Sequence, residues 1–231
     1  MKKCVVLFSG GIDSTTALFW AKEKYDKVHA LTFDYGQRHR IEIKLSKHLI
    51  DKIDIPQTVL TIDLTQIGGS SLTDKNIPVP DYDPNKKNSQ KLPSSYVPFR
   101  NGIFLSLAAA WGEAHEIYEI ICGFNVIDSP DYPDTRKEFV ESMEKCINTG
   151  TSASRTHQKF QIKAPFIQKK KSEIIKQGLS LGADYSYSIS CYSGKEIPCF
   201  KCPACRMRQK AWEEAGVKDH LVKRLEKEGK L

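Results

Sequence analysis

Long hydrophobic runs are missing from this sequence. Across its 231 residues, no stretch approaches the roughly 20 consecutive apolar residues that a membrane-spanning helix needs. The apolar segment 103–111 is bounded by Arg100 and Glu113. The short run after Met1-Lys2-Lys3 reaches glycine and charge too soon for a secretory leader. The sequence therefore predicts a cytoplasmic protein that does not reside in a membrane.

Two common nucleotide-binding fingerprints are also missing. The glycine-containing turn near the N-terminus does not end in the Gly-Lys-Ser/Thr of a Walker A site. It also lacks the three-glycine spacing of a dinucleotide-binding turn. These absences argue against an enzyme that transfers a terminal phosphoryl group and against a dinucleotide-dependent enzyme.

Composition and charge set the broad class. With 40% hydrophobic residues, the chain can bury a real core, and its length suits one α/β domain plus an appendage rather than a disordered chain. The formal net charge of +7 leaves binding of tRNA or DNA open, because clustered lysines and arginines bind phosphates. The dense places are 169–171 and 218–230, and the second alternates with glutamates as a solvated helix does. Nucleic-acid binding is therefore a minor alternative.

Short apolar runs alternate with helical patterns along the chain. Strands are predicted at 4–8, 27–33, 57–62, 118–123 and 160–166. Helices are predicted at 14–25, 41–52, 101–115, 136–148 and 171–181. This alternation predicts an α/β fold with a doubly wound, mainly parallel sheet. We expect residues 1–184 to form this domain and residues 185–231 a small helical C-terminal segment.

The segment 63–98 interrupts the alternation. It is polar and contains Pro78, Pro80, Pro84 and Pro93. A loop of this length in a compact domain is usually a functional lid or is disordered.

The turn after the first predicted strand has the features of a phosphate cradle. Free backbone N–H groups and the helix dipole favour an anion where a strand passes into a helix. Gly10 and Gly11 let the backbone approach phosphate oxygens, Ser9 and Ser14 can donate hydroxyl hydrogens, and Asp13 can orient the loop or hold Mg²⁺. The alternative is a glycine turn that only ends a strand. The predicted nucleotide contacts are Phe8, Ser9, Gly10, Gly11, Ile12, Asp13, Ser14 and Thr15.

Four closely spaced cysteines near the C-terminus predict a metal site. Cys191, Cys199, Cys202 and Cys205 are spaced C-x7-C-x2-C-x2-C, and four thiolates at such intervals can close a tetrahedral Zn²⁺ site. Disulfides are disfavoured in a reducing cytosol. An all-cysteine set leaves no position for water, so we expect a structural zinc. The remaining cysteines, Cys4, Cys122 and Cys146, fall in apolar or helical stretches and are interpreted as packed thiols.

The turn Ser9-Gly10-Gly11-Ile12-Asp13-Ser14 resembles the PP-loop motif of ATP pyrophosphatases, Ser-Gly-Gly-x-Asp-Ser. Members of that superfamily adenylate a substrate oxygen and release pyrophosphate. The resemblance implies an adenine nucleotide alpha hydrolase-like fold in which the loop grips the departing pyrophosphate. Lys171 matches the second basic element of the superfamily, which stabilises charge on the phosphates. An exposed lysine that merely begins a helix is the alternative at this position.

Further blocks extend the resemblance over nearly the whole chain. Together with the cysteine cluster, they are similar to the 7-cyano-7-deazaguanine synthase family, of the queuosine and archaeosine precursor pathway. The blocks are Asp34-Tyr35-Gly36-Gln37-Arg38-His39, Tyr96-Val97-Pro98 with Arg100-Asn101, and Tyr132-Pro133-Asp134 with Arg136. The chain departs from the family where Pro130-Asp131 replaces Ser-Gly and where Phe200 replaces the usual glycine after Cys199. The first departure lies beside expected substrate contacts, and the second leaves the four metal ligands in place.

The resemblance implies a reaction. Family members convert 7-carboxy-7-deazaguanine to the nitrile with ammonia and ATP. A carboxylate resists ammonia, so its oxygen first attacks the α-phosphorus, and AMP then serves as the leaving group for amide formation. Adenylation of the amide oxygen and loss of a second AMP give the nitrile. The length leaves no room for a glutaminase domain, so free ammonia is expected as the nitrogen source.

The resemblance also implies roles for particular residues. Asp13, Lys171 and Arg100 are the expected catalytic residues. Arg38 and Arg100 are expected to pair with the substrate carboxylate or phosphates, and Asp128 or Asp134 to accept hydrogen bonds from the guanine-like edge. Tyr96, Phe99 or Tyr132 would stack on the ring. At each of these positions the alternative is a loop residue with a purely structural bond, and His39 is the weaker candidate for moving protons.

Two other functions stay open at this point. A PP-loop tRNA thiolase would use the positive charge for RNA and a cysteine to carry sulfur, but four cysteines are assigned to zinc and three to apolar or helical stretches. A nucleic-acid-binding zinc module that only senses the nucleotide would bind ATP without turnover. We expect small-molecule partners only, with no nucleic acid or membrane required, and the resemblance suggests a homodimer.

Overall fold

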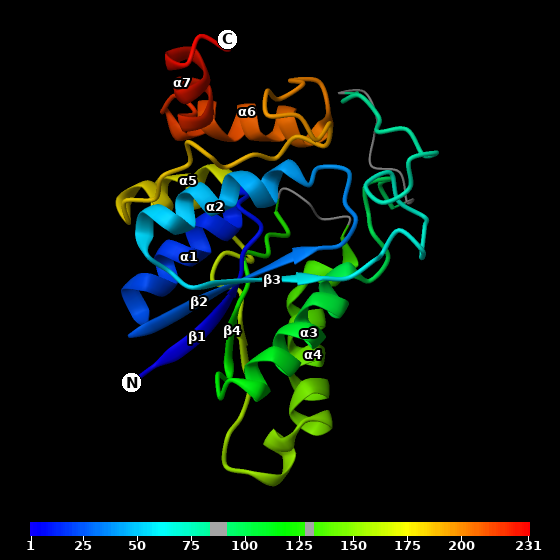
Figure 1. Ribbon diagram of the computed structural model, residues 1–231, viewed down its shortest axis with the longest axis vertical. Coiled ribbons are helices and arrows are strands. Elements are labelled where there is room, and N and C mark those ends of the chain that lie inside the picture. The colour runs from blue at the N-terminus through cyan, green and yellow to red at the C-terminus, as the bar shows by residue number, and fades with distance from the viewer. Residues whose placement is uncertain (84–91, 128–131) are drawn as a thin grey trace.

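A parallel sheet lies at the centre of the protein, which we describe from a computed structural model over residues 1–83, 92–127 and 132–231 (Figure 1). Within these residues the sheet has five strands in the order β3-β2-β1-β4-β5, and every neighbouring pair is parallel. The strands are β1 (Lys3–Leu7), β2 (Lys27–Asp34), β3 (Gln57–Thr61), β4 (Glu119–Ile121) and β5 (Gln161–Lys163). The parallel sheet predicted from sequence is confirmed.

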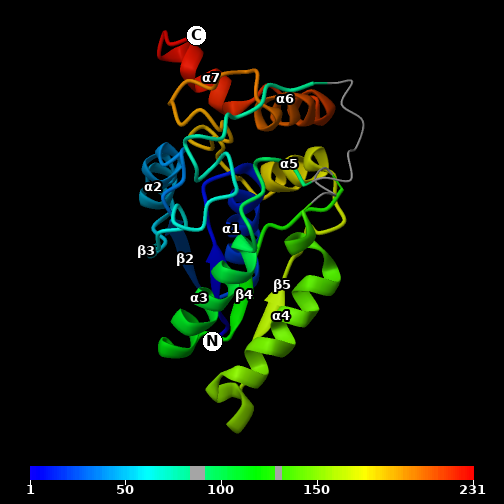
Figure 2. The same cartoon turned by 90° about the vertical axis from the view of Figure 1, so that its right-hand side faces the viewer.

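Helices cover both faces of the sheet (Figures 1 and 2). One face carries α1 (Ile12–Lys24), α2 (Ile41–Ile53) and α5 (Lys171–Ser180), and the other carries α3 (Arg100–Ala114) and α4 (Lys137–Gly150). Side chains alternate along a strand, so Val5 joins the core beneath α3 while Cys4 and Val6 join the core beneath α1. Burial on both faces explains why the strands read as continuous apolar runs.

The chain reverses its direction across the sheet between β1 and β4. The first three strands extend the sheet one way from β1, and β4 pairs with the other side of β1. Loops that leave the carboxyl ends of two such strands diverge and open a crevice, which is where ligands bind in open α/β sheets. The predicted phosphate cradle follows β1, so the topology places it at this reversal.

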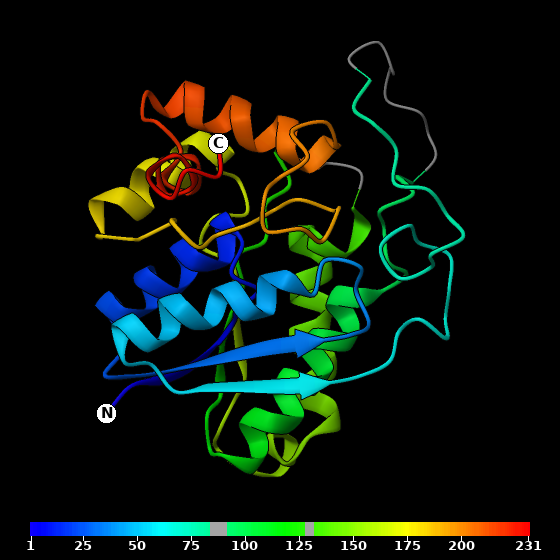
Figure 3. The same cartoon turned by 45° about the horizontal axis from the view of Figure 1, so that its top comes forward.

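The C-terminal segment lies over the helical layer of α1, α2 and α5 (Figures 1 and 3). It contains α6 (Pro203–Ala215) and α7 (His220–Lys227). Trp212 and Ala215 of α6 share a buried cluster with Ile12 of α1 and Ile175 of α5. Arg208 joins the two C-terminal helices by donating to both carboxylate oxygens of Asp219, at 2.5 and 2.7 Å. The segment thus packs on the sheet domain, and the boundary between residues 184 and 185 stays a prediction.

The predicted elements are present, with shifts at their ends. Helix α1 begins at Ile12, two residues before the predicted start. β4 and β5 have three residues each and are shorter than predicted. The interpretation of Cys146 as a packed thiol is wrong: it is exposed, because α4 buries Val140, Met143 and Ile147 on its other side. Cys4 and Cys122 are buried as expected.

The described parts of segment 63–98 form an irregular layer beyond the carboxyl ends of β2 and β3 (Figure 1). A backbone hydrogen bond of 2.7 Å, from the Ser71 amide to the Ser94 carbonyl, joins its two described parts. Its Tyr82 amide donates to the carbonyl of Lys201, within the cysteine cluster, at 3.0 Å. Two short 3₁₀ turns, at Pro133–Thr135 and Ser152–Arg155, flank α4. Among the residues described, no helix combines the length and apolar character that crossing a membrane requires.

Candidate active site

The turn after β1 is closed by its own serines. The hydroxyls of Ser9 and Ser14 lie 3.1 Å apart, and the Ser14 hydroxyl donates to the Gly11 carbonyl at 3.1 Å. The Gly11 amide in turn donates to the Ser9 hydroxyl at 3.3 Å. Thr15 is the first residue of α1 whose amide donates back along the helix, to Gly11 at 2.9 Å. The amides of residues 12–14 therefore belong to the unpaired first turn, which favours an anion.

Gly10 lets this turn approach helix α2. Its φ is +81°, and a Cβ built there would lie 2.6 Å from the Cβ of Ser46. A second glycine, Gly123 after β4, faces the turn from the other strand of the reversal. A Cβ on Gly123 would lie 2.7 Å from the carbonyl carbon of Asp13 and 2.9 Å from the Ser14 amide. No sequence pattern singled out Gly123, because its role depends on two strands that are adjacent only in space.

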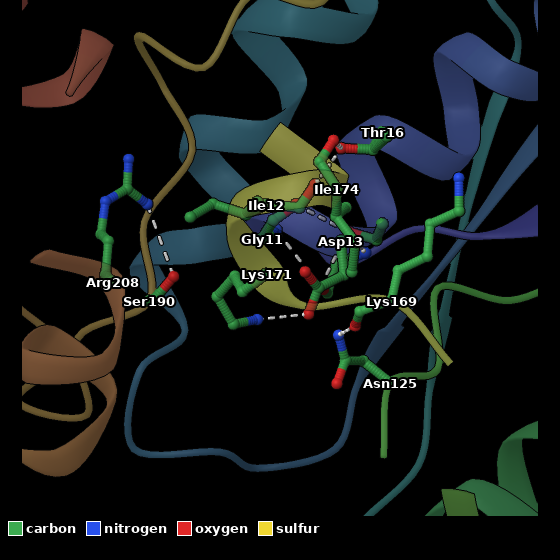
Figure 4. A network of polar contacts seen from close by, with 12 residues as sticks. Gly11, Ile12, Asp13, Thr16, Asn125, Lys169, Lys171, Ile174, Ser190 and Arg208 are labelled. Carbon is green, nitrogen blue, oxygen red and sulfur yellow. Dashed lines mark hydrogen bonds and ion pairs between the residues drawn. The ribbon is translucent and has the colours of Figure 1, made fainter. Parts of the chain in front are cut away.

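An ion pair between Lys171 and Asp13 joins the first turns of helices α5 and α1 (Figure 4). Lys171 is the first residue of α5, and its Nζ lies 2.6 Å from Asp13 Oδ2, in the first turn of α1. The Lys170 amide donates to the Glu173 carboxylate at 2.8 Å, which fixes the start of α5. The Asp13 Oδ1 atom is buried and has no hydrogen-bond partner among the described residues. The second basic element expected from the sequence thus lies at the cradle.

Asn125 holds the segment that leads into α5. Its side-chain amide donates to the carbonyl of Lys169, two residues before Lys171 (Figure 4). Asn125 itself follows β4, on the same loop as Gly123. The loop after β4 therefore contacts both parts of the cradle.

Three of the eight predicted nucleotide contacts have side chains in the core. Phe8 is packed beneath α1, and Ile12 belongs to the cluster around Tyr185 and Trp212. Thr15 is fully buried. These residues can contact a nucleotide only through their backbone, whereas Ser9 and Asp13 are partly accessible.

A second group of polar side chains lies where β2 meets the start of α3. The Arg100 guanidinium donates to the Tyr35 hydroxyl at 3.1 Å and lies over the rings of Tyr35 and Phe104. Burial opposes the charge of Arg100, but Tyr35, Asp134 and Glu42 more than offset this effect, so the pKa of Arg100 is raised. Its Nε is buried without a partner among the described residues. A cation of this kind, with an unused donor, suits a carboxylate ligand.

Three further residues that were predicted to contact the substrate lie around this group, and each also makes contacts within the protein. They are Asp134, Tyr96 and Tyr132. Asp134 accepts from the Asn101 amide at 3.0 Å and so caps the start of α3, while its Oδ1 is buried without a partner in the described chain. The Tyr132 hydroxyl lies 2.8 Å from the Ser95 hydroxyl, and its ring centroid is 6.1 Å from that of Tyr96. Phe99 is exposed and precedes α3 with φ +52°. Asp128 lies outside the described residues, as does the departure at Pro130-Asp131.

Arg38 is engaged within the protein. Its Nη2 donates to the carbonyls of Asp74 and Ile77, at 2.8 and 3.1 Å, and its backbone amide donates to Leu72. Arg38 thereby holds the segment 72–77 against the turn after β2. These contacts occupy Nη2, and the assignment of Arg38 to the substrate stays a prediction.

The structure adds side chains that the sequence analysis did not select. Gln37 is buried, and its amide donates to the Phe33 carbonyl and to Glu42 Oε1. Glu42 Oε1 lies 3.5 Å from Nε2 of His39. Tyr192 lies 6.0 Å from His39 between ring centroids, and burial raises its pKa. The sequence offered a signal for Tyr192, which follows the predicted metal ligand Cys191, but none for Glu42, which lies in the first turn of a predicted helix.

The four cysteines converge as predicted. The Sγ atoms of Cys191, Cys199, Cys202 and Cys205 all lie within 4.8 Å of one another. Tetrahedral coordination with bonds of about 2.3 Å separates sulfur atoms by about 3.8 Å, so the cluster fits one metal ion. Backbone amides of Cys199 and Cys202 donate to the sulfurs at 3.2 and 3.4 Å. Hydrogen bonds among these sulfurs lower the pKa of Cys191 and raise the pKa of Cys202 and of Cys205, so the thiols share their protons until a metal displaces them.

Phe200 in this cluster has φ +56°. The left-handed conformation favours glycine, so the glycine that the resemblance leads us to expect here would adopt it without strain. The substitution leaves the four sulfurs in place, as the sequence analysis expected.

Known proteins of similar fold include two solved structures. One is a predicted subunit of tRNA methyltransferase from Methanocaldococcus jannaschii, with a TM-score of 0.51 and 17% identity over 80% of this chain and 75% of that chain. The other is a 4-thiouridine synthetase in complex with RNA and bound ATP, with a TM-score of 0.51 and 17% identity over 93% of this chain and 50% of that chain. At this identity, the likeness supports the PP-loop type of fold and nothing further.

Sequence relatives are much nearer. The family model of the queuosine biosynthesis protein QueC matches residues 3–216. The 7-cyano-7-deazaguanine synthase of Clostridium kluyveri is 45% identical over 229 residues, which are 98% of this chain and 100% of that protein. The 7-cyano-7-deazaguanine synthase of Saccharophagus degradans is 41% identical over 221 residues, 94% of this chain and 96% of that protein. Because the match covers nearly the full length of both partners, the chain belongs to the QueC family of 7-cyano-7-deazaguanine synthases.

Proposed function

We propose that this enzyme converts 7-carboxy-7-deazaguanine and ammonia to 7-cyano-7-deazaguanine, with ATP cleaved to AMP and pyrophosphate. The observation that carries the proposal is the meeting of two helix starts at the sheet reversal, where Lys171 contacts Asp13. An anion placed there faces the unpaired amides of α1 and the Lys171 ammonium. Family membership supplies the substrate class.

In the adenylation step, the cradle formed by residues 8–15 holds the β- and γ-phosphates. Ser9 and Ser14 donate through their hydroxyls, and Lys171 neutralises charge that grows on the departing pyrophosphate. Asp13 Oδ1 is a buried carboxylate oxygen without a hydrogen-bond partner in the described chain, and it suits a hard cation such as Mg²⁺. The α-phosphorus is left open to the substrate oxygen.

The acid is bound at the second polar group. Arg100 pairs with its carboxylate through the unused Nε, and Tyr96 and Tyr132 stack on the ring. Asp134 accepts hydrogen bonds from the guanine-like edge through its unpaired Oδ1. We assign the same role to Asp128 from its position in the sequence alone. Given its two carbonyl contacts, we assign Arg38 to holding the segment 72–77 over this pocket rather than to the substrate.

The cysteine cluster holds a structural Zn²⁺. Four thiolates leave no open coordination position, and soft sulfur ligands in a tetrahedral set favour zinc over hard cations. The metal, when bound, fixes the loop that carries Tyr192 beside His39. Homodimer formation and a cytoplasmic location stay predictions.

One incubation tests the proposal. Purified enzyme is mixed with ATP, Mg²⁺, ammonium and 7-carboxy-7-deazaguanine, and products are detected by mass spectrometry. We expect the nitrile together with AMP and pyrophosphate, in a ratio of two AMP per nitrile. Formation of ADP and orthophosphate would contradict the proposal. Nucleotide cleavage that requires tRNA and a sulfur donor would instead identify a thiolase, and ATP binding without cleavage would identify a sensing module.

A further inference from the structure

Glu42 lies between the phosphate cradle and the Arg100 group. It belongs to the first turn of α2, and a Cβ built on Gly10 would lie 3.5 Å from its backbone carbonyl. Its side chain extends toward Arg100 and Tyr35, which both interact electrostatically with it. Glu42 is therefore an acidic residue between the predicted site of adenylation and the predicted site of the acid.

The contacts that hold the carboxyl group of Glu42 in place involve one of its two oxygens, Oε1. Its side chain is 12% exposed. Oε1 accepts from the Gln37 amide at 3.3 Å and lies 3.5 Å from His39 Nε2. Within the part of the chain that the structure describes, Oε2 makes no hydrogen bond. His39 Nδ1, which is buried beside it, also has no partner there. One carboxylate oxygen is thus left to meet a small polar ligand.

We propose that Glu42 accepts a proton from the ammonium ion that supplies the nitrogen, and so generates ammonia next to the acyl adenylate. The inference rests on the proposed function. Ammonium holds its proton at neutral pH, as a lysine ammonium does, and has no lone pair for attack. A buried carboxylate attracts this cation more strongly than water does, because the local dielectric is low.

Ammonium transfers one proton to Glu42 Oε2, and the freed nitrogen lone pair forms a bond to the acyl carbon. The bond between that carbon and the phosphate oxygen breaks, and AMP leaves with the electron pair. The second proton passes from the nitrogen to the AMP phosphate. The products are the amide, AMP and protonated Glu42, which releases its proton to solvent before the next turnover.

The surroundings of Glu42 suit a proton acceptor that works near neutral pH. Burial raises the pKa of Glu42 to about 8, against the lowering effects of Gln37 and Arg100. The groups that face it are Gln37, His39, Tyr35 and Arg100. At pH 7 a group with this pKa is ionised in about one molecule in ten, and an ammonium ion beside it favours the ionised form, so the carboxylate that accepts the proton forms as ammonium binds.

The test separates adenylation from attack by nitrogen. Acid-dependent exchange between pyrophosphate and ATP measures adenylation, and hydroxylamine traps the acyl adenylate as a hydroxamate without prior loss of a proton. For Glu42→Gln we expect both activities within about twofold of the wild type, while amide formation from ammonium near pH 7 falls about 10²–10⁴-fold. Near pH 9, where free ammonia is more abundant, most of the lost rate should return.

Two variants complete the design. Glu42→Asp keeps a carboxylate and should recover part of the ammonium-dependent rate near pH 7. Glu138→Gln, an exposed glutamate in the first turn of α4, serves as the matched control and should behave as wild type. Ammonium-dependent amide formation by Glu42→Gln at the wild-type rate near pH 7 would overturn the inference alone. Parallel loss of exchange and hydroxamate would assign Glu42 to binding the acid or to holding the fold, and would also overturn it. Absence of acid-dependent exchange in the wild type would overturn the proposed function as well.

Discussion

Lys171 Nζ and Asp13 Oδ2 lie 2.6 Å apart although 158 residues separate them in the chain. Each belongs to the first turn of a helix, and the two side chains are mostly buried, at 15% and 23% exposure. The pair places a cation and an anion beside amides that already favour a negative ligand. It therefore prepares the site for a phosphate chain and a cation together.

Replacement of Lys171 by alanine should reduce acid-dependent exchange between pyrophosphate and ATP by about 10²–10³-fold, because one preorganised donor to the leaving group is removed. The thermal midpoint of the variant should stay close to that of the wild type. Lys170→Ala is the matched control, since Lys170 is adjacent and exposed. Equal loss in both variants would mean that general positive charge, and not the contact with Asp13, supports adenylation.

Gly123→Ala should weaken ATP binding by about tenfold or more. The added methyl group would lie 2.7 Å from the Asp13 carbonyl carbon, and overpacking of this kind costs about 1–3 kcal/mol if the turn moves away. Calorimetric titration with a non-hydrolysable ATP analogue measures the effect. Gly150→Ala, which meets nothing within 4 Å, controls for the substitution itself. Unchanged affinity in Gly123→Ala would show that the cradle does not depend on the loop after β4.

Removal of the metal should destabilise the protein. Mass spectrometry under native conditions should find one zinc ion per chain in the wild type and none in Cys202→Ser. Loss of a structural metal costs on the order of 4 kcal/mol, which lowers the thermal midpoint of a chain of this size by roughly 10 °C. Cys146→Ser, at an exposed cysteine on α4, should change neither value. A wild-type chain without metal, or a Cys202→Ser midpoint equal to that of wild type, would contradict the assignment.

Arg38→Ala should loosen the segment 72–77. The substitution removes the donor to the carbonyls of Asp74 and Ile77, a loss of about 1–2 kcal/mol that raises the open population about 5–30-fold. Trypsin should then cut faster after Lys75, which lies between these two residues. Arg40→Ala removes an exposed ion pair with Asp34 and should leave the cleavage rate unchanged. Resistance of Arg38→Ala to trypsin would return Arg38 to the candidates for substrate binding.

The buried Glu42 should make stability depend on pH. Burial raises the pKa of Glu42 from 4.5 to about 8, so the folded chain holds a proton that the unfolded chain has lost. The free energy of unfolding contributed by this group therefore falls as pH rises from about 4.5 to about 8, and levels off above that range. Glu42→Gln should remove this fall, so its stability relative to wild type should increase with pH. Denaturant unfolding at several pH values measures the difference, and parallel pH profiles for the two proteins would show that Glu42 is not desolvated.

Local patterns determined much of this protein. The alternation of apolar runs and helical segments predicted the parallel sheet, because each strand is buried on both faces and each helix buries one side. The Ser9–Ser14 turn was recognisable because its glycines and hydroxyls act on the same short stretch of backbone. The cysteine spacing predicted a metal site because four thiolates within 15 residues can converge without help from the rest of the chain.

Contacts between distant residues were decided only by the tertiary structure. Gly123 meets Asp13 because β4 pairs with β1, and no pattern within either segment carries that pairing. Glu42 reads as an ordinary position in the first turn of a helix until α2 packs beside Arg100. The contacts of Arg38 Nη2 with the carbonyls of Asp74 and Ile77 likewise depend on where the segment 72–77 packs. Cys146 reads as a core residue until α4 turns its other side to the sheet. Sequence patterns specify the elements because those interactions are local, whereas the environment of each side chain depends on which elements pack together.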